Sequence, residues 1–341
     1  MKSEDDTLVV TLDDEEVSRI PFDELDAVYY FGYKSIRPTL MNACAEHGVK
    51  ISVFHPDGQF MSNITSYASE DDFLLLRRQY TIAENHTEAG ILIARHIVGA
   101  KIFNSRWFLG RIHHLYKDYI DLDIISKKQK ILHELVNEAL ATREVAPLYA
   151  LSKRASAETY SVFNDLILFE KNFFTFKGRS TKQPVDPVNA LLTFAYRLIR
   201  EKCEAAVLAA GLDPYVGFFN EESPERKSLV FDIMEEFKAC IADRFVITLI
   251  NEEKIGKDDF VKDDFDSYSI AKNSIPAILD YWHEFNSDTV IHTFIEEDIE
   301  WGNLPYTSAI LLSQFIRNKI DKYPPFFRQD PPKKGMQLKR R

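Results

Sequence analysis

The first seventy positions carry short runs of β-branched and aromatic residues, bounded by polar and turn-forming residues. Such runs are typical of β-strands, and we expect five: Thr7–Leu12, Val17–Pro21, Ala27–Phe31, Val49–Phe54 and Phe60–Ile64. The segment Ser35–His47 interrupts them with apolar residues at helical spacing, which predicts a helix. Asp57-Gly58, before the last run, is a hairpin-turn signal. This part of the chain is therefore expected to be mostly β.

From Asp72 onward the apolar residues recur with a helical period. This period predicts helices over 74–83, 88–115, 189–209, 270–285 and 309–320, and a further helix that begins at Ser228. A loop is expected over 173–188, and an acidic loop or small hairpin over 258–269. We therefore predict an α+β protein with a small N-terminal β domain (1–70), a larger, mostly α-helical domain (71–330) and a basic tail (331–341).

Composition narrows the class of protein. The chain has 341 residues, 45% hydrophobic and 28% charged, which suits an ordinary globular protein with room for two cores. No apolar run approaches the about 20 residues that a membrane span requires, and the acidic N-terminus is unlike a secretory signal. The few, unclustered cysteines (Cys44, Cys203 and Cys240) favour a reducing cytoplasm and disfavour a zinc site.

The stretch Leu212–Ala242 contains most of the candidate site residues. It contains a turn, a charged loop and a helix for which Ser228 is the predicted N-cap. Asp232, Glu235 and Glu236 share one side of this helix, opposite an apolar stripe of Val230, Ile233, Met234, Phe237 and Ile241. These carboxylates form either a solvated acidic face or part of a site for a divalent metal, which prefers oxygen ligands.

The same stretch resembles the signature of the CRISPR adaptation integrases, the first CRISPR-associated protein or Cas-one family. Members carry a GLDPYVGFLH-like run, a basic loop and a helix that reads roughly SLALDLMEEFRP. Residues 211–217 (GLDPYVG) and 228–237 (SLVFDIMEEF) match in order and spacing. Residues 189–196 (NALLTFAY) and 323–327 (YPPFF) resemble two further family elements. The resemblance covers nearly the whole chain and is greatest to the branch found in subtype C of type I systems.

This resemblance implies a metal-dependent DNA endonuclease and integrase that inserts foreign DNA fragments into a CRISPR array. It implies Mg²⁺ or Mn²⁺ as the cofactor, which would polarise a phosphoryl group. The implied partners are double-stranded and branched DNA, a second copy of the chain, and the small second CRISPR-associated protein (Cas-two family). The homodimer interface is expected in the N-terminal β domain, the location is expected to be cytoplasmic, and no membrane partner is expected.

Carried over position by position, the resemblance identifies the candidate site. The family holds its metal with a Glu in a GIEG-like motif, the His that ends GF(I/L)H, and an acid on the later helix. These positions fall on Ser152, Asn220 and Glu235, with Asp232 as the accompanying acid, so one expected ligand of three is retained. The candidate catalytic positions are these four residues, and the candidate metal ligands are Asn220, Asp232 and Glu235. Glu158 is a candidate substitute for Ser152, but it lies about 240° around the helix.

Seven basic residues are candidate contacts to DNA phosphates: Arg77, Arg78, Lys101, Arg106, Arg111, Arg226 and Lys227. Three of them, Lys101, Arg106 and Arg111, resemble the family's GK..N.R..L.R pattern together with Asn104. Ordinary surface charge explains basic residues on a helix equally well. The tail from Lys333 to Arg341 is a further basic arm or a solvated end. The net charge of −11 argues against an extended basic footprint, because phosphate contacts supply most DNA affinity.

Three readings of the sequence remain open. The first is an active integrase and endonuclease with a relocated metal site. The second is a catalytically silent family member that keeps the fold, dimerises, and binds DNA or the small partner protein. The third is a scaffold or interaction protein outside the adaptation machinery. Intact turn and apolar motifs beside altered polar ligands favour the silent reading over the active one.

Overall fold

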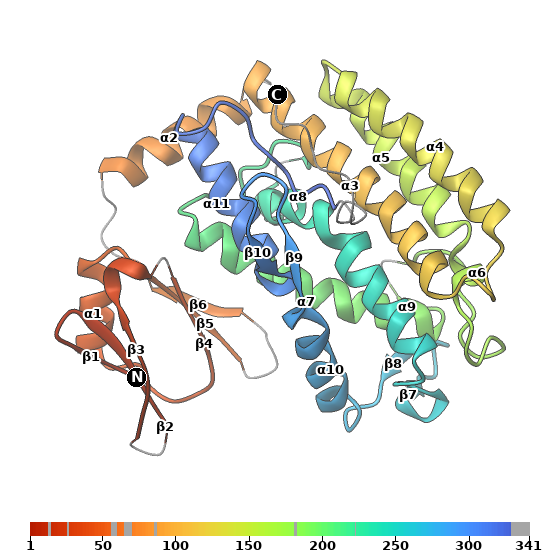
Figure 1. Cartoon of the computed structure of the whole chain (residues 1–341), viewed down its shortest axis with the longest axis horizontal. Helices are drawn as coiled ribbons and strands as arrows, with labels where there is room; N and C mark the ends of the chain where they lie inside the picture. The colour runs from red at the N-terminus through yellow and green to blue at the C-terminus, as the bar shows by residue number, and fades with distance from the viewer. Residues whose placement is uncertain are drawn as a thin grey trace, which may run out of the picture. The chain divides into compact units, whose positions relative to one another are not determined.

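The computed structural model describes residues 1–12, 15–25, 27–55, 60–64, 70–84, 87–180, 183–221 and 223–328. Strands make up most of the N-terminal part and helices most of the remainder (Figure 1). The predicted α+β fold class is therefore confirmed. The predicted turn at Asp57-Gly58 and the basic tail 331–341 lie outside the described residues. Within the described ranges, no helix has both the length and the apolar character needed to cross a membrane.

The first N-terminal sheet is antiparallel. It consists of β1 (Lys2–Glu4), β2 (Thr7–Leu12) and β3 (Glu15–Pro21), in that order. The central strand β2 buries Leu8 and Val9. The two longer strands fall on the predicted runs, and β1 is an additional three-residue edge strand that the hydrophobic pattern did not indicate.

The second N-terminal sheet contains a parallel pair. β4 (Ala27–Phe31) runs parallel to β5 (Lys50–Phe54), and β5 is antiparallel to β6 (Phe60–Ile64). A parallel pair needs a crossover connection, which the predicted helix supplies as α1 (Pro38–Glu46). Residues of both sheets and of α1 share one buried apolar cluster, made of Leu8, Phe22, Leu40, Cys44, Val49 and Ile51.

The helical part follows the predicted period. Its helices are α2 (Glu70–Glu84), α3 (Glu88–Leu115), α4 (Leu122–Ala141), α5 (Val145–Tyr160), α6 (Phe163–Leu166), α7 (Pro187–Ala209), α8 (Ser228–Phe237), α9 (Arg244–Asn251), α10 (Ile275–Ser287) and α11 (Leu304–Ile316). Helix α10 begins five residues later than predicted, because Ile270 belongs to a strand and Pro276 favours a start at the first helical turn.

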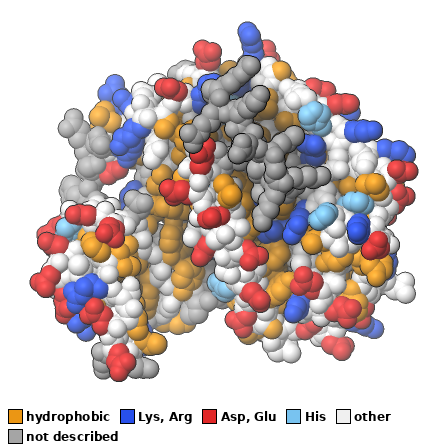
Figure 2. All heavy atoms as spheres, viewed as in Figure 1, with side chains coloured by type: hydrophobic (Ala, Val, Ile, Leu, Met, Phe, Trp, Pro, Cys, Tyr) orange, Lys and Arg blue, Asp and Glu red, His pale blue; other side chains and the backbone are white. Residues whose placement is uncertain are grey.

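Two short antiparallel pairs interrupt the helices. β7 (Phe260–Lys262) pairs with β8 (Tyr268–Ile270), so the acidic segment predicted as a loop or small hairpin is a hairpin. β9 (Thr289–Ile291) pairs with β10 (Asp298–Glu300), which the sequence pattern did not predict. Acidic and basic side chains are interspersed over the face of the molecule shown in Figure 2.

The chain forms two compact units, each assembled from three segments. The first unit contains Met1–Ala94, Tyr196–Met234 and Pro305–Tyr323, and the second contains Arg95–Ala195, Glu235–Leu304 and Pro324–Arg341. The boundary falls within α8, so Asp232 belongs to the first unit and Glu235 to the second.

Candidate functional site

Helix α8 buries its acidic residues as well as its apolar ones. The predicted apolar stripe is confirmed, since Val230, Ile233, Met234, Phe237 and Ile241 are all buried. Asp232 and Glu236 have no exposed surface and Glu235 is 6% exposed, so the interpretation as a solvated acidic face is wrong. A buried carboxylate is costly unless it is hydrogen-bonded or ion-paired. The hydrogen-bond and ion-pair partners of each carboxylate therefore determine whether its oxygens could bind a metal ion.

Ser228 has a different local role from the one predicted. It is the first residue of α8, and its hydroxyl donates to the backbone carbonyl of Glu221 at 2.6 Å. The hydroxyl therefore ties the preceding loop to the helix, whereas an N-cap residue would precede the first helical turn and accept from a backbone N–H.

In the first unit, the Asp232 carboxylate is fully used as a hydrogen-bond acceptor. Its oxygens accept from the backbone N–H groups of Phe218 (2.6 Å), Phe219 (3.0 Å) and Asn220 (2.8 Å), and from the Asn220 side-chain amide (2.8 Å). An ionised carboxylate has about four acceptor positions, and four donors occupy them. Burial raises the pKa of Asp232 to about 6, and the four donors oppose that rise. Asp232 thus anchors the segment that ends in Asn220.

The close approach of this segment to α8 requires Gly217. A Cβ atom at position 217 would lie 2.9 Å from Asp232 Oδ2 and 3.0 Å from the backbone carbon of Ser228. The first distance is shorter than real Cβ contacts and the second is tighter than most of them, so a larger residue would displace the segment from the Asp232 carboxylate. The glycine of the family-like run is explained by this packing.

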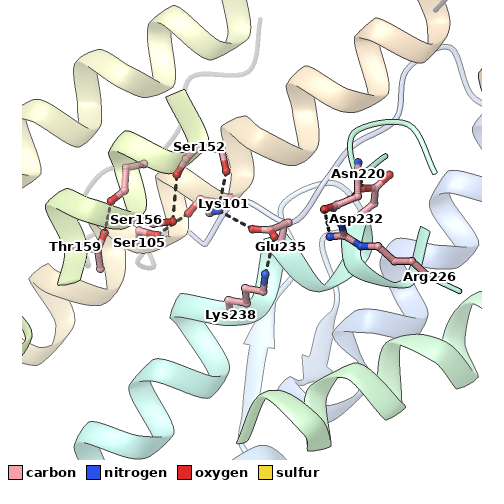
Figure 3. Close-up of polar contacts among 11 residues, drawn as sticks. Lys101, Ser105, Ser152, Ser156, Thr159, Asn220, Arg226, Asp232, Glu235 and Lys238 are labelled. Carbon is pink, nitrogen blue, oxygen red and sulfur yellow. Dashed lines mark hydrogen bonds and ion pairs between the residues drawn. The ribbon is translucent and has the colours of Figure 1, made fainter. Parts of the chain in front are cut away.

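Asn220 has its amide oxygen engaged as well. Arg226 Nη2 donates to Asn220 Oδ1 at 2.6 Å, and the same guanidinium lies 4.8 Å from the centroid of the Phe231 ring. Figure 3 shows Asn220 and Arg226 beside Asp232. The amide oxygen, which is the candidate cation ligand of Asn220, therefore faces a guanidinium group.

In the second unit, two lysines bind the Glu235 carboxylate. Lys101 Nζ lies 2.8 Å from Oε2 as an ion pair, and Lys238 Nζ donates to Oε1 at 2.6 Å. Lys101 Nζ also donates to the Ser152 hydroxyl at 2.7 Å (Figure 3). An ammonium group thus stands between the side chains of Ser152 and Glu235, two of the predicted catalytic positions.

The Glu235 carboxylate is held in its charged form. Burial by itself raises the pKa of Glu235, but the ion pairs with Lys101 and Lys238 outweigh it and lower the pKa to about 2. Burial also lowers the pKa of Lys101, against the attraction of Glu235. Two ammonium groups thus contact one carboxylate, and the buried Asp243 is a further negative charge that acts on Lys101.

The backbone after α8 brings Lys238 to this position. The helix continues into a π-helical segment, Lys238–Asp243, before α9 begins. Such segments are rare and frequently mark functional sites. Lys238 lies three residues after Glu235, the spacing at which oppositely charged side chains on a helix meet. That spacing was visible in the sequence, but Lys238 was not among the predicted site residues.

Glu158, the candidate substitute ligand, has a separate ion pair. Its Oε2 lies 2.7 Å from Lys128 Nζ of α4, and both side chains are partly exposed. Ser152 is buried on the same helix, and its hydroxyl accepts from Lys101. The contacts of Glu158 and Ser152 thus involve different partners.

Glu236 and Asn104 hold the chain near Phe326. Glu236 Oε2 accepts from the Phe326 backbone N–H at 2.8 Å. The buried Asn104 amide donates to the backbone carbonyls of Glu236 and Phe326, and its oxygen accepts from the Arg328 N–H, each at 2.8 Å. Sequence reasoning placed Asn104 in a family pattern without a role, and the structure assigns it to the packing of the YPPF-like element.

Comparison with known proteins identifies the family. A family model described as "CRISPR associated protein Cas1" matches residues 1–284. The chain belongs to the Cas1 family. The function of that family is spacer acquisition by an integrase and endonuclease, as the resemblance implied. The more specific prediction of a subtype C branch stays a prediction.

Named relatives and solved structures agree with this membership. The "CRISPR-associated endonuclease Cas1 2" of Rhodospirillum rubrum is 30% identical, covering 96% of this chain and 95% of the relative. The "CRISPR-associated endonuclease Cas1 1" of Chlorobaculum tepidum is 29% identical, covering 96% and 94%. A Cas1 protein from Thermotoga maritima has the same fold, with a TM-score of 0.68 at 20% identity over 92% of both chains. A casposase bound to integration product has a TM-score of 0.70 at 19% identity over 91% and 89%.

Cas1 proteins are generally metal-dependent, and the predicted ligands of this chain do not fit a divalent cation. Both oxygens of Glu235 face lysine ammonium groups, the oxygens of Asp232 face N–H donors, and the amide oxygen of Asn220 faces Arg226. Over the part of the chain that the structure describes, no group of three or more His, Cys, Asp or Glu side chains is placed to hold a metal ion. We therefore derive no chemical step through a bound metal.

The seven candidate DNA-contact residues differ in solvent exposure and in whether their charge already has a partner within the protein. Arg77 and Arg111 are exposed and Arg106 is half-buried. The other four have partners within the protein: Arg78 with the Arg317 carbonyl, Lys101 with Glu235, Arg226 with Asn220, and Lys227 with Glu204. Their contacts to DNA stay predictions, and Arg77 and Arg111 are the candidates with the most accessible charge.

Proposed function

We propose that this chain is a catalytically silent member of the Cas1 family, which takes part in spacer acquisition through its fold and its partners. The observation that carries the proposal is the pair of lysine ammonium groups on the two oxygens of Glu235. A divalent metal would have to displace both cations, and their charge repels it in a buried site where Coulomb forces are strong. The ammonium groups of Lys101 and Lys238 thus occupy the positions beside the Glu235 oxygens that a metal ion would need.

The partners of the proposed role are DNA, a second copy of the chain and a Cas2 protein. Structural neighbours support the first and last, since one is a casposase bound to integration product and another is a partial Cas6-RT-Cas1–Cas2 complex, with a TM-score of 0.74 at 21% identity. We propose the homodimer interface in residues 1–70, where several large apolar side chains are exposed: Leu12, Val17, Phe31, Tyr33 and Met61. Cys44, Cys203 and Cys240 are buried and form no disulfide, which supports a cytoplasmic location.

The deciding experiment measures cleavage and strand transfer on branched DNA with Mn²⁺ or Mg²⁺. Wild type, Glu235→Ala and the exposed control Glu225→Ala are compared, with the Rhodospirillum rubrum relative as an active reference. We expect all three forms of this chain to stay at the same background, because Glu235 holds no metal. Metal-dependent activity that is present in wild type and Glu225→Ala but lost in Glu235→Ala would overturn the proposal.

A second experiment measures Mn²⁺ binding directly, by electron paramagnetic resonance of the free ion. The Lys101 ammonium lies 2.7 Å from Ser152 Oγ and 2.8 Å from Glu235 Oε2, so it bridges two positions from which oxygen ligands could reach one cation. Combining Lys101→Ala with Ser152→Glu should raise Mn²⁺ affinity at least about tenfold over wild type, because a carboxylate pair then replaces the ammonium. A folded double variant that binds no more Mn²⁺ than wild type would refute this account of the site.

A further inference from the structure

A second cluster of cationic side chains lies in the second unit and has no part in the contacts of Glu235. Arg111 lies on α3, Arg244 begins α9, and Arg328 lies in the C-terminal segment. Aromatic rings from α3, α10 and the turn after β10 line this cluster. We call the whole set the arginine cluster, and it consists of Arg111, Arg244, Arg328, Trp107, Phe285 and Trp301.

Arg244 is at the centre of the arginine cluster. Its guanidinium carbon lies 4.2 Å from the ring centroid of Trp301, 4.3 Å from that of Phe285 and 5.8 Å from that of Trp107. The guanidinium of Arg328 lies 5.1 Å from Trp107 and 5.7 Å from Trp301. Aromatic rings therefore pack against the faces of the guanidinium groups, and rings supply no acceptor to the N–H groups at the edges.

The Arg244 guanidinium lacks a counter-anion. Its Nε is buried without a hydrogen-bond partner, and among the described residues no carboxylate or carbonyl forms an ion pair or hydrogen bond with the side chain. Burial lowers the pKa of Arg244 to about 10, and the positive charges of Arg111 and Arg328 add to that effect. Asp288, the acidic side chain that opposes it, is exposed.

This arrangement is costly for the protein alone. Cation–π contacts offset only part of the cost of burying a charged group without a counter-charge. The chain has 53 acidic residues against 42 basic ones, so acidic partners are plentiful in its composition. A guanidinium left without one, beside two further arginines, has the chemistry of a site for an external anion.

The arginine cluster can be reached from solvent. Arg111 is exposed, and Arg244 and Arg328 are half-buried, whereas Trp107 and Trp301 are buried. The guanidinium groups are thus closer to solvent than the rings that pack against them. The charge of the cluster calls for a negatively charged ligand.

We propose that the arginine cluster binds a phosphate group of a nucleic-acid strand, with Arg244 as its central ligand. Guanidinium groups bind phosphate through two parallel N–H···O bonds, which gives Arg its advantage over Lys at such sites. The choice of a nucleic acid as the source of the phosphate rests on the proposed function, while the phosphate site itself rests on the contacts of Arg244.

The test uses the full chain and inorganic phosphate as the probe. Thermal unfolding and calorimetric titration are compared in phosphate and chloride buffers of equal ionic strength. Wild type should be stabilised by phosphate, and Arg244→Met should lose at least about tenfold in phosphate affinity while unfolding at a higher temperature than wild type in chloride. Arg19→Met, which removes an exposed arginine paired with Glu4 and Glu16, is the control and should bind phosphate as wild type does.

A variant of the exposed Arg111 keeps the proposal testable if Arg244→Met fails to fold. Arg111→Gln should fold normally and weaken phosphate binding several-fold. Equal phosphate binding by wild type, Arg244→Met and Arg111→Gln would overturn the site and leave the arginine cluster as packing alone.

Oligonucleotides then identify the source of the phosphate. A 5′-phosphorylated single strand and its hydroxyl-ended counterpart compete with inorganic phosphate on wild type. Stronger competition by the phosphorylated strand assigns a terminal phosphate, and equal competition assigns backbone phosphates. Competition by neither strand would overturn the nucleic-acid assignment. Because these readouts involve no metal and no cleavage, their failure is distinguishable from failure of the proposed silent function.

Discussion

Removing the Glu235 carboxylate should destabilise the protein, and the sign of this effect separates the lysine-bound network from a metal site. In Glu235→Gln the ammonium groups of Lys101 and Lys238 lose their common counter-charge. The pKa of Glu235 falls from 4.5 to about 2 on folding. At about 1.4 kcal/mol for each pKa unit, the ionised carboxylate contributes ~3 kcal/mol to stability at pH 7. Breaking a buried ion pair by removing one partner costs about 3–5 kcal/mol, which agrees.

In an empty metal site formed by clustered carboxylates, the same substitution would have the opposite effect. Neutralising one carboxylate there relieves repulsion between like charges and stabilises the fold. The assay is urea unfolding at pH 7 of wild type, Glu235→Gln and the control Glu158→Gln. The Glu158 pair with Lys128 is partly exposed, so its removal should cost about 0–1 kcal/mol.

The pH dependence provides a second check on the same reasoning. Because the folded-state pKa of Glu235 is depressed, its contribution is fully present above pH 4.5 and is lost as the pH falls toward about 2. The difference in stability between wild type and Glu235→Gln should therefore be constant from pH 7 to pH 5 and shrink at lower pH. A Glu235→Gln protein as stable as wild type at pH 7, or more stable, would refute the lysine-bound network.

Three further predictions concern other residues. Gly217→Ala should destabilise the fold by about 1–3 kcal/mol in urea unfolding, because its Cβ would meet Asp232 Oδ2 at 2.9 Å; unchanged stability would contradict the packing described for this loop. Folding raises the pKa of Asp232 from 3.8 to about 6, so this carboxyl adds stability that is fully present below pH 3.8 and is lost as the pH rises through 6. Thermal unfolding of Asp232→Ala between pH 4 and 7 should therefore lack the pH-dependent part of the stability that wild type owes to Asp232. Arg77→Ala should weaken DNA binding and reduce the salt slope by about 1, with Arg78→Ala as the neighbouring comparison, and an unchanged slope would reject the Arg77 phosphate contact.

Most of the fold could be predicted from local sequence patterns. Runs such as Thr7–Leu12 and Lys50–Phe54 are rich in β-branched and aromatic residues, and the helical period from Asp72 onward corresponds to the observed helices. The β9–β10 pair was not predicted, because each strand has three residues and a strand that short has no distinctive pattern.

The candidate site was harder to predict, because its partners are distant or belong to the backbone. Hydrophobic patterning treats Glu235 as a surface residue, and the half-buried Lys101 that pairs with it comes from 134 positions earlier in the chain. Asp232 is satisfied mainly by backbone N–H groups, which every sequence contains and which therefore give no sequence signal. Lys238 was the exception, because its i,i+3 spacing from Glu235 was readable in advance.

The hydrogen bonds of Asn104 and Glu236 have a consequence for how the protein is made. Asn104 and Glu236 both form hydrogen bonds with the backbone of Phe326, which lies 222 residues after Asn104 and 90 residues after Glu236. Until residues 324–328 have been synthesised, the hydrogen bonds of these two buried side chains to Phe326 and Arg328 cannot form. The second unit therefore completes these contacts only late in synthesis, when most of its residues have already been made.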